Sequence, residues 1–170
     1  MKKRILCISA TLLALSIIIA VIFGVQLMTV GYNHVWKYSA DYQNFANDFN
    51  VVKNFVAAEF PNESDIWLSI SNNGDGDIKI YDPEAKNYII LPSNVASSLA
   101  SIYYNAFPDK DSNFDTIRIH GNRISFCISS GEYALVYSPD TKPSWVNSPG
   151  ENSKVKIKSI QDGWYHVTKN

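Results

Sequence analysis

The chain has 170 residues, of which 18% are charged, and its formal net charge is −1, so its size fits one medium domain plus an additional segment. Three of the 15 basic residues are Lys2, Lys3 and Arg4, and all 16 acidic residues follow residue 31, so the chain beyond that point has a net charge of −4. This acidic balance excludes nucleic acid as an expected partner, because nucleic-acid-binding domains present a basic surface.

The first element is an uncharged apolar segment, residues 5–30, which follows a short basic tail, residues 1–4. As a helix this segment is about 39 Å long, and the hydrocarbon core of a bilayer is about 30 Å thick. A cleaved signal peptide has an apolar core of only about 7 to 15 residues, so an uncleaved signal-anchor helix is favoured. Secretion after signal cleavage is the alternative. The basic tail predicts a cytoplasmic N-terminus and an extracytoplasmic C-terminal part in the cell membrane.

A juxtamembrane linker, residues 31–40, leads to a predicted amphipathic helix over residues 41–60. Asp41 is the expected N-cap, and Pro61 ends the helix because proline disfavours helical geometry in the residue before it. Apolar residues recur at three- and four-residue steps and predict that one face packs on a sheet. These residues are Tyr42, Phe45, Phe49, Val52, Val56 and Phe60.

Alternating apolar and polar residues predict strands over residues 65–71 and 77–81. The apolar run 88–91 predicts a third strand or an extension of the second. Residues 92–107 then form a second helix, for which Ser93 is the expected N-cap. The inner face of this helix is predicted to contain Val95, Leu99, Ile102, Tyr103 and Ala106.

Alternation continues in three strands over residues 114–120, 123–129 and 132–138, and a final hairpin follows over residues 154–160 and 163–168. Their apolar residues are expected to face inward, whereas polar residues such as Thr116, Arg118 and His120 face outward. Tight turns are expected at Gly121-Asn122, Ser130-Gly131 and Asp162-Gly163. Because such turns join antiparallel strands, residues 41–170 are predicted to form one α+β domain, a mainly antiparallel sheet with two helices packed on it.

Asn73, Asp75 and Asp77 have nearly the spacing of calcium ligands in a helix–loop–helix site. Such a site needs glycine at the sixth position of its loop, and this chain has Ile78 there, a β-branched residue that resists positive φ. Strands are predicted on both sides of the segment. A hairpin turn is therefore favoured over a calcium site, and the chain is expected to hold no cofactor.

Cysteines and histidines offer no further chemical motif. Cys7 and Cys127 lie on opposite sides of the predicted membrane, and an outer domain without its own disulfide favours a bacterial surface protein. Cys127 lies in an alternating strand and is expected to be a small buried hydrophobe. His34, His120 and His166 are far apart in sequence, the last two on faces predicted to point outward, so zinc is not expected. No serine lies in a Gly-x-Ser-x-Gly elbow, and no catalytic residue is predicted.

Four residues are candidates for binding. Trp145 lies in a polar, proline-containing loop, residues 138–153, where it either caps the core or anchors a partner. Lys154, Lys156 and Lys158 alternate with apolar residues and share one face of a strand. They either protect an exposed sheet edge from aggregation or contact anionic lipid headgroups or cell-wall polymers.

The sequence thus predicts a single-pass membrane protein with a non-enzymatic, surface-tethered module that binds a ligand, a protein or a cell-envelope component. The alternative is a small membrane-tethered enzyme that acts on cell-envelope substrates. A pocket containing an acid or a histidine with a perturbed pKa favours the enzyme, whereas an aromatic patch near Trp145 favours the binding module.

Overall fold

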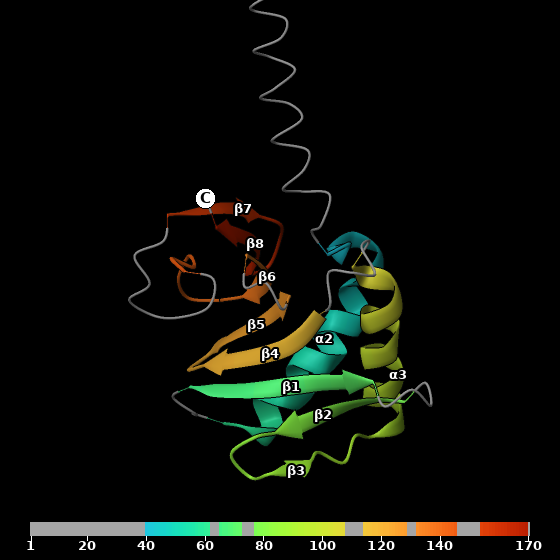
Figure 1. The fold of residues 1–170 in the computed structure, drawn as a ribbon. Coiled ribbons are helices and arrows are strands. Elements are labelled where there is room, and N and C mark those ends of the chain that lie inside the picture. Colours follow the sequence, from blue (N-terminus) through green and yellow to red (C-terminus); the bar gives the residue numbers. More distant parts are fainter. Residues whose placement is uncertain are drawn as a thin grey trace, which may run out of the picture. The chain divides into compact units, whose positions relative to one another are not determined.

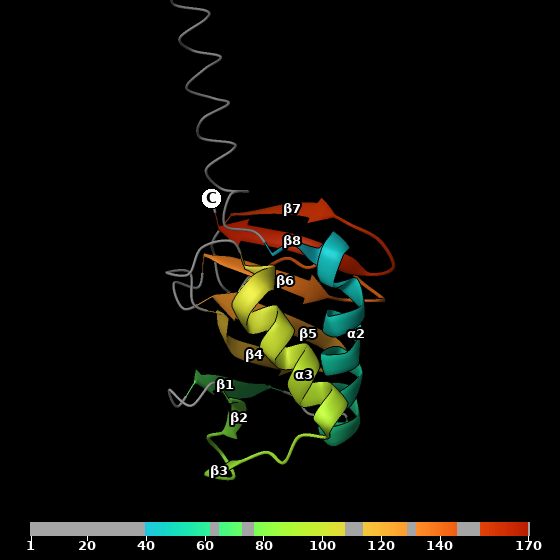
Figure 2. The same ribbon diagram turned by 90° about the vertical axis from the view of Figure 1, so that its right-hand side faces the viewer.

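A computed structural model describes residues 40–61, 65–72, 77–107, 114–128, 132–145 and 154–169. These residues form an α+β unit with an eight-stranded antiparallel sheet, and both long helices lie on the same face of that sheet (Figures 1 and 2). The predicted membrane helix, residues 5–30, lies outside the described residues. Among the described helices, none is long and apolar enough to cross a membrane.

Helix α2 spans Tyr42–Glu59 and confirms the first predicted helix. The Asp41 side chain caps it by accepting a hydrogen bond from the Asn44 backbone N–H at 3.2 Å. Pro61 follows its C-cap, Phe60. The buried face consists of Tyr42, Phe49, Val52 and Val56.

Helix α3 spans Ser93–Ser101 and continues as a π-helix over Ile102–Ala106. The prediction of Ser93 as the N-cap is wrong: Pro92 occupies that position, and no side chain caps this end. Pro92 is extended at ψ 148°, and its carbonyl oxygen accepts from the Ala96 N–H at 2.9 Å, so the first turn closes without a serine cap. Helix α3 is joined to α2 by Ser98 and Ser101, which both donate to the Asp48 carboxylate, at 2.8 and 2.7 Å.

The sheet has the strand order β3-β2-β1-β4-β5-β6-β8-β7, and every neighbouring pair is antiparallel. The strands are β1 (Ile66–Asn72), β2 (Ile78–Asp82), β3 (Asn87–Tyr88), β4 (Phe114–His120), β5 (Arg123–Ile128), β6 (Tyr133–Tyr137), β7 (Val155–Ser159) and β8 (Trp164–Lys169). Consecutive strands pair with each other, except that α3 lies between β3 and β4 in the chain and that β6 pairs with β8 instead of β7. The predicted hairpins and the three-strand meander are confirmed.

Two of the predicted turns have the expected backbone conformation. In the β4–β5 turn, φ is +59° at Gly121 and is not positive at Asn122, as in a type II′ turn. In the β7–β8 turn, both Asp162 (φ +47°) and Gly163 (φ +81°) are in the left-handed region, as in a type I′ turn. The Ser130-Gly131 turn lies outside the described residues.

The apolar run 88–91 forms less strand than its composition predicts. Strand β3 contains only Asn87 and Tyr88, and Ile90 is 92% exposed. The turn at residues 83–86 reverses the chain so that β3 pairs with only the end of β2, and the following residues connect to α3. An apolar run at a sheet edge therefore stays partly solvated, because nothing in the described part of the chain covers Ile90.

The main core fills the space between the helices and the sheet. Phe49 of α2 is fully buried at its centre and contacts the rings of Phe126 and Trp164, with centroid distances of 5.1 and 6.0 Å. The opposite face of the sheet is covered as well. Arg118 lies on the face that the alternation predicts, away from the helices. The expectation that it faces solvent is wrong, because Arg118 and Arg123 are only 3% and 6% exposed there.

Candidate functional site

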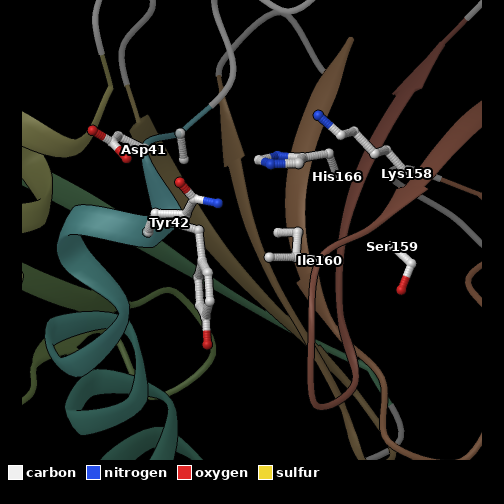
Figure 3. Close-up of a pocket in the computed structure, with 8 residues that line it drawn as sticks. Asp41, Tyr42, Lys158, Ser159, Ile160 and His166 are labelled. Atoms are coloured by element: carbon white, nitrogen blue, oxygen red, sulfur yellow. The ribbon is translucent and has the colours of Figure 1, made fainter.

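A polar pocket of about 430 Å³ lies between the first turn of α2 and the β7–β8 hairpin (Figure 3). It opens on the face of the sheet that carries the helices. Its lining residues are Ala40, Asp41, Tyr42, Gln43, Lys158, Ser159, Ile160 and His166. The pocket thus joins the start of the folded unit to the last two strands of the chain.

A short chain of hydrogen bonds fixes the floor of this pocket. The Ala40 backbone N–H donates to the Tyr133 hydroxyl oxygen at 2.9 Å, and the Tyr133 hydroxyl lies 2.7 Å from Nδ1 of His166. Tyr133 is buried, and burial raises the pKa of its hydroxyl, so the hydroxyl keeps its proton. Because its oxygen already accepts from Ala40, we assign the Tyr133 proton to the bond with His166 Nδ1.

This assignment determines the state of His166. Burial, together with the nearby charge of Lys158, lowers the pKa of His166 to about 4, so the ring is neutral at neutral pH. With Nδ1 accepting from Tyr133, the single ring proton is on Nε2. His166 therefore acts as a hydrogen-bond donor at Nε2 and has no lone pair there to accept a proton.

The side chains around the pocket differ in direction. Figure 3 shows the Lys158 amine and the His166 ring pointing into the space between the strands and α2, whereas the Ser159 hydroxyl points away. The Asp41 carboxylate also points away from His166, and it accepts from the Asn44 side chain at 2.6 Å. The pocket is therefore rich in donors on its strand side.

His166 lies on a different face from the one predicted. The alternation predicts an outward face, but His166 lies on the helix side of β8, beside Leu135 of β6 and in line with buried Trp164. The hydrogen bond between Tyr133 and His166 joins residues that are 33 positions apart in the sequence and lie on neighbouring strands. Alternation in the sequence identifies both strands, but the β6–β8 register that brings these two side chains together is not visible in it.

The three candidate lysines are all exposed on the helix-bearing face of the sheet, at its β7 edge. Lys156 and Lys158 belong to β7, and Lys154 directly precedes it. Only Lys158 lines the pocket. Their common face and edge position agree with the sequence pattern, and the same arrangement suits either protection of the edge or contact with anions.

Trp145 lies elsewhere, on the face of the sheet without helices. Its ring stacks under the Arg123 guanidinium at 3.4 Å and contacts the His120 ring at 5.5 Å. Arg123 Nη2 also donates to the Trp145 carbonyl oxygen at 2.6 Å. Arg118 lies between Trp145 and Trp67 and forms a two-bond ion pair with Asp65 at 2.9 and 2.7 Å. Trp145 thus covers two buried arginines, and the structure does not bring it together with the lysines.

Residues considered for metal or thiol chemistry are separate from the pocket. Asn73 and Asp75 lie outside the described residues, and Asp77 immediately precedes β2, whose Ile78 is buried and pairs with Asn72. No group of three or more metal-ligating side chains occurs among the residues that the structure describes. Cys127 is buried, and burial raises the pKa of its thiol to about 12, so it stays protonated.

Comparisons with known proteins identify no relative. A scan of protein families, a search of curated proteins and a search of solved structures each give no match to this chain. The functional argument therefore depends on the residues and their geometry.

Proposed function

We propose that this chain is a single-pass membrane protein whose residues 41–170 form an extracytoplasmic, non-enzymatic binding module. The charge-free segment 5–30 and the basic residues before it support the anchor and its orientation. The polar pocket beside Lys158 is the proposed ligand site, and its ligand is a protein or a component of the cell envelope.

The hydrogen bond from Tyr133 to His166 is the observation that favours binding over catalysis. A histidine with a lowered pKa in a pocket is a feature of many active sites and favours the enzyme alternative. A general base, however, needs a lone pair directed at the substrate. His166 uses its lone pair at Nδ1 to accept from Tyr133, whose hydroxyl oxygen in turn accepts from the Ala40 N–H. A neutral Nε2–H donor beside a lysine suits recognition of an acceptor group better than proton abstraction.

Site-specific photo-crosslinking tests the proposal on the full chain in its native membrane. A photoreactive residue replaces Gln43, an exposed residue that lines the pocket, and the control position is Glu84, which is exposed in the turn between β2 and β3. We expect an adduct from position 43 that is absent from position 84 and is reduced in a Lys158→Met background. Equal adducts at both positions would contradict a ligand site here, and a trapped ligand that is chemically converted by the protein but not by His166→Asn would favour the enzyme.

A further inference from the structure

A second cleft, of about 620 Å³, lies at the other end of α2 from the polar pocket. One wall is the C-terminal half of α2, and the other consists of the β4–β5 turn and the end of β6. Its lining residues are Lys53, Asn54, Ala57, Phe60, Pro61, Ile119, Gly121, Asn122, Ile124, Tyr137 and Pro139. Volumes of about 300 to 1,000 Å³, mainly apolar walls and a few polar groups are typical of small-molecule sites.

Of the described residues that line this cleft, Lys53 is the only cation. Its amine lies 4.1 Å from the centre of the Tyr137 ring, so a cation–π contact holds the amine against the cleft wall. Within the described part of the chain, Lys53 forms no ion pair. Burial lowers the pKa of Lys53, in agreement with an amine that no carboxylate pairs with in the described part of the chain.

An acidic residue at the rim of the cleft does not compensate the charge of Lys53. Asp140 follows Pro139 at the rim, and its carboxylate accepts a hydrogen bond from the Asn122 side chain. Neither Asp140 nor any other carboxylate of the described residues lines the cleft. The cleft thus combines an apolar wall with one cation that is held in place and lacks an anion.

We propose that this cleft binds a small amphiphile, an apolar chain or ring that carries one carboxylate or phosphate group, with the anion at Lys53 and the apolar part against Ala57, Phe60 and Ile124. The anion completes the environment of a partly desolvated ammonium, which gives more affinity than the same charge in full solvent. The apolar part removes Phe60, Pro61 and the edge of Tyr137 from water. A neutral ligand gains only the apolar contacts, and a cationic ligand is repelled by Lys53.

Methyl NMR of the full chain in lipid nanodiscs tests the site with defined probes. Isoleucine δ1-methyl groups are labelled, so that Ile119 and Ile124 report on the cleft and Ile160 reports on the polar pocket. The probes are cyclohexylacetate, cyclohexylmethyl phosphate and the neutral cyclohexylethanol. We expect saturable shifts at Ile119 and Ile124, with either anion bound about five- to tenfold more tightly than the alcohol, and the ratio of the two anions identifies the preferred head group.

Two variants and a matched control make the test decisive. Lys53→Met keeps the aliphatic stem and removes the charge, so it should weaken both anions about five- to tenfold and leave the alcohol unchanged. Ala57→Trp fills the cleft from an exposed helix position and should abolish all shifts. Lys86→Met, in the distant β2–β3 turn, should change nothing. Equal affinity of anion and alcohol, an unaltered affinity in folded Lys53→Met, or shifts confined to Ile160 would overturn the proposal, and none of these outcomes depends on the ligand of the polar pocket.

Discussion

At the scale of single residues, His166 makes the stability of the domain depend on pH. Its pKa is about 4 in the folded chain, compared with 6.5 for an ordinary, solvated histidine such as that of the unfolded chain. Between these values the unfolded chain binds a proton that the folded chain does not, so the free energy of unfolding decreases as the pH falls from about 6.5 to about 4. Each pKa unit corresponds to about 1.4 kcal/mol, and after allowance for solvent screening of a partly buried ring we expect a loss of about 1 to 3 kcal/mol.

Denaturant unfolding at about pH 7 and about pH 4.5 measures this loss, with His166→Asn as the comparison. The asparagine carboxamide oxygen can accept from Tyr133 and does not titrate, so this part of the pH dependence should disappear in the variant. The other groups at the pocket, Lys158 and Asp41, are common to both proteins and cancel in the comparison. If both proteins lose the same stability on acidification, His166 is not the titrating group.

Two glycines in tight turns differ in what surrounds them. A Cβ at Gly121 meets no atom within 4 Å, whereas a Cβ at Gly163 lies 3.1 Å from the Cα of Pro139. Both have positive φ, which costs a residue with a side chain about 1 to 2 kcal/mol. We therefore expect Gly121→Ala to lose about 1 kcal/mol of unfolding free energy and Gly163→Ala to lose about 1 kcal/mol more, because the backbone of the 138–145 segment must also move. If the two variants have equal midpoints in thermal or denaturant unfolding, the contact with Pro139 does not contribute to the loss of stability.

At the scale of elements, Trp145 packs the segment that follows β6, residues 138–145, against the sheet. The segment 138–145 ends with Trp145 on the Arg123 guanidinium and over Arg118, two cations that are almost fully buried. A desolvated cation–π contact contributes up to about 2 kcal/mol. Trp145→Ala removes this contact with both arginines and also the buried apolar area of the indole ring, so we expect it to cost about 2 to 3 kcal/mol of unfolding free energy. Trp67→Ala, which removes a 43% exposed ring from Arg118 alone, should cost about 1 kcal/mol.

A double-mutant cycle separates this contact from general loss of packing. Arg123→Met, Trp145→Leu and the double variant are compared by denaturant unfolding, and a coupling of about 1 to 2 kcal/mol is expected. Additive effects would mean that Trp145 contributes only buried area. The aromatic residue would then be available as the anchor for a partner, which is the other role that its sequence context allows.

Elements with a strong local signal could be predicted from the sequence, and contacts between elements could not. Asp41 and Pro61 delimit α2, and the Gly121-Asn122 and Asp162-Gly163 pairs specify their hairpins, because caps and turns depend on a few adjacent residues. Burial of Arg118 and Arg123 escaped prediction because a remote loop covers a face that alternation marks as polar. The polar pocket could not be predicted either, because it also depends on contacts between remote elements. The pairing of β6 with β8 and the position of α2 bring together Ala40, Tyr133 and His166.

At the scale of the whole molecule, the charge distribution predicts the orientation in the membrane. Lys2, Lys3 and Arg4 precede the apolar segment, and basic flanks are retained on the cytoplasmic side. Residues 31–39 can span at most about 31 Å when fully extended, so the folded unit that starts at Ala40 is expected to stay near the outer surface. Should the β7 edge face that surface, each of its exposed lysines is expected to contribute about 1 kcal/mol of attraction to anionic headgroups.

Cysteine labelling of intact cells tests this topology. In a Cys7→Ser background the remaining cysteine, Cys127, is buried and should react little. Lys156→Cys should then react with a membrane-impermeant maleimide in intact cells, because Lys156 is exposed on the domain, whereas Lys2→Cys should react only after permeabilisation. The reverse pattern would exclude an extracytoplasmic domain. Labelled Lys156→Cys protein in the medium, shortened at its N-terminus, would instead establish secretion after cleavage, since an intact charge-free segment of this length should hold the domain on the cell.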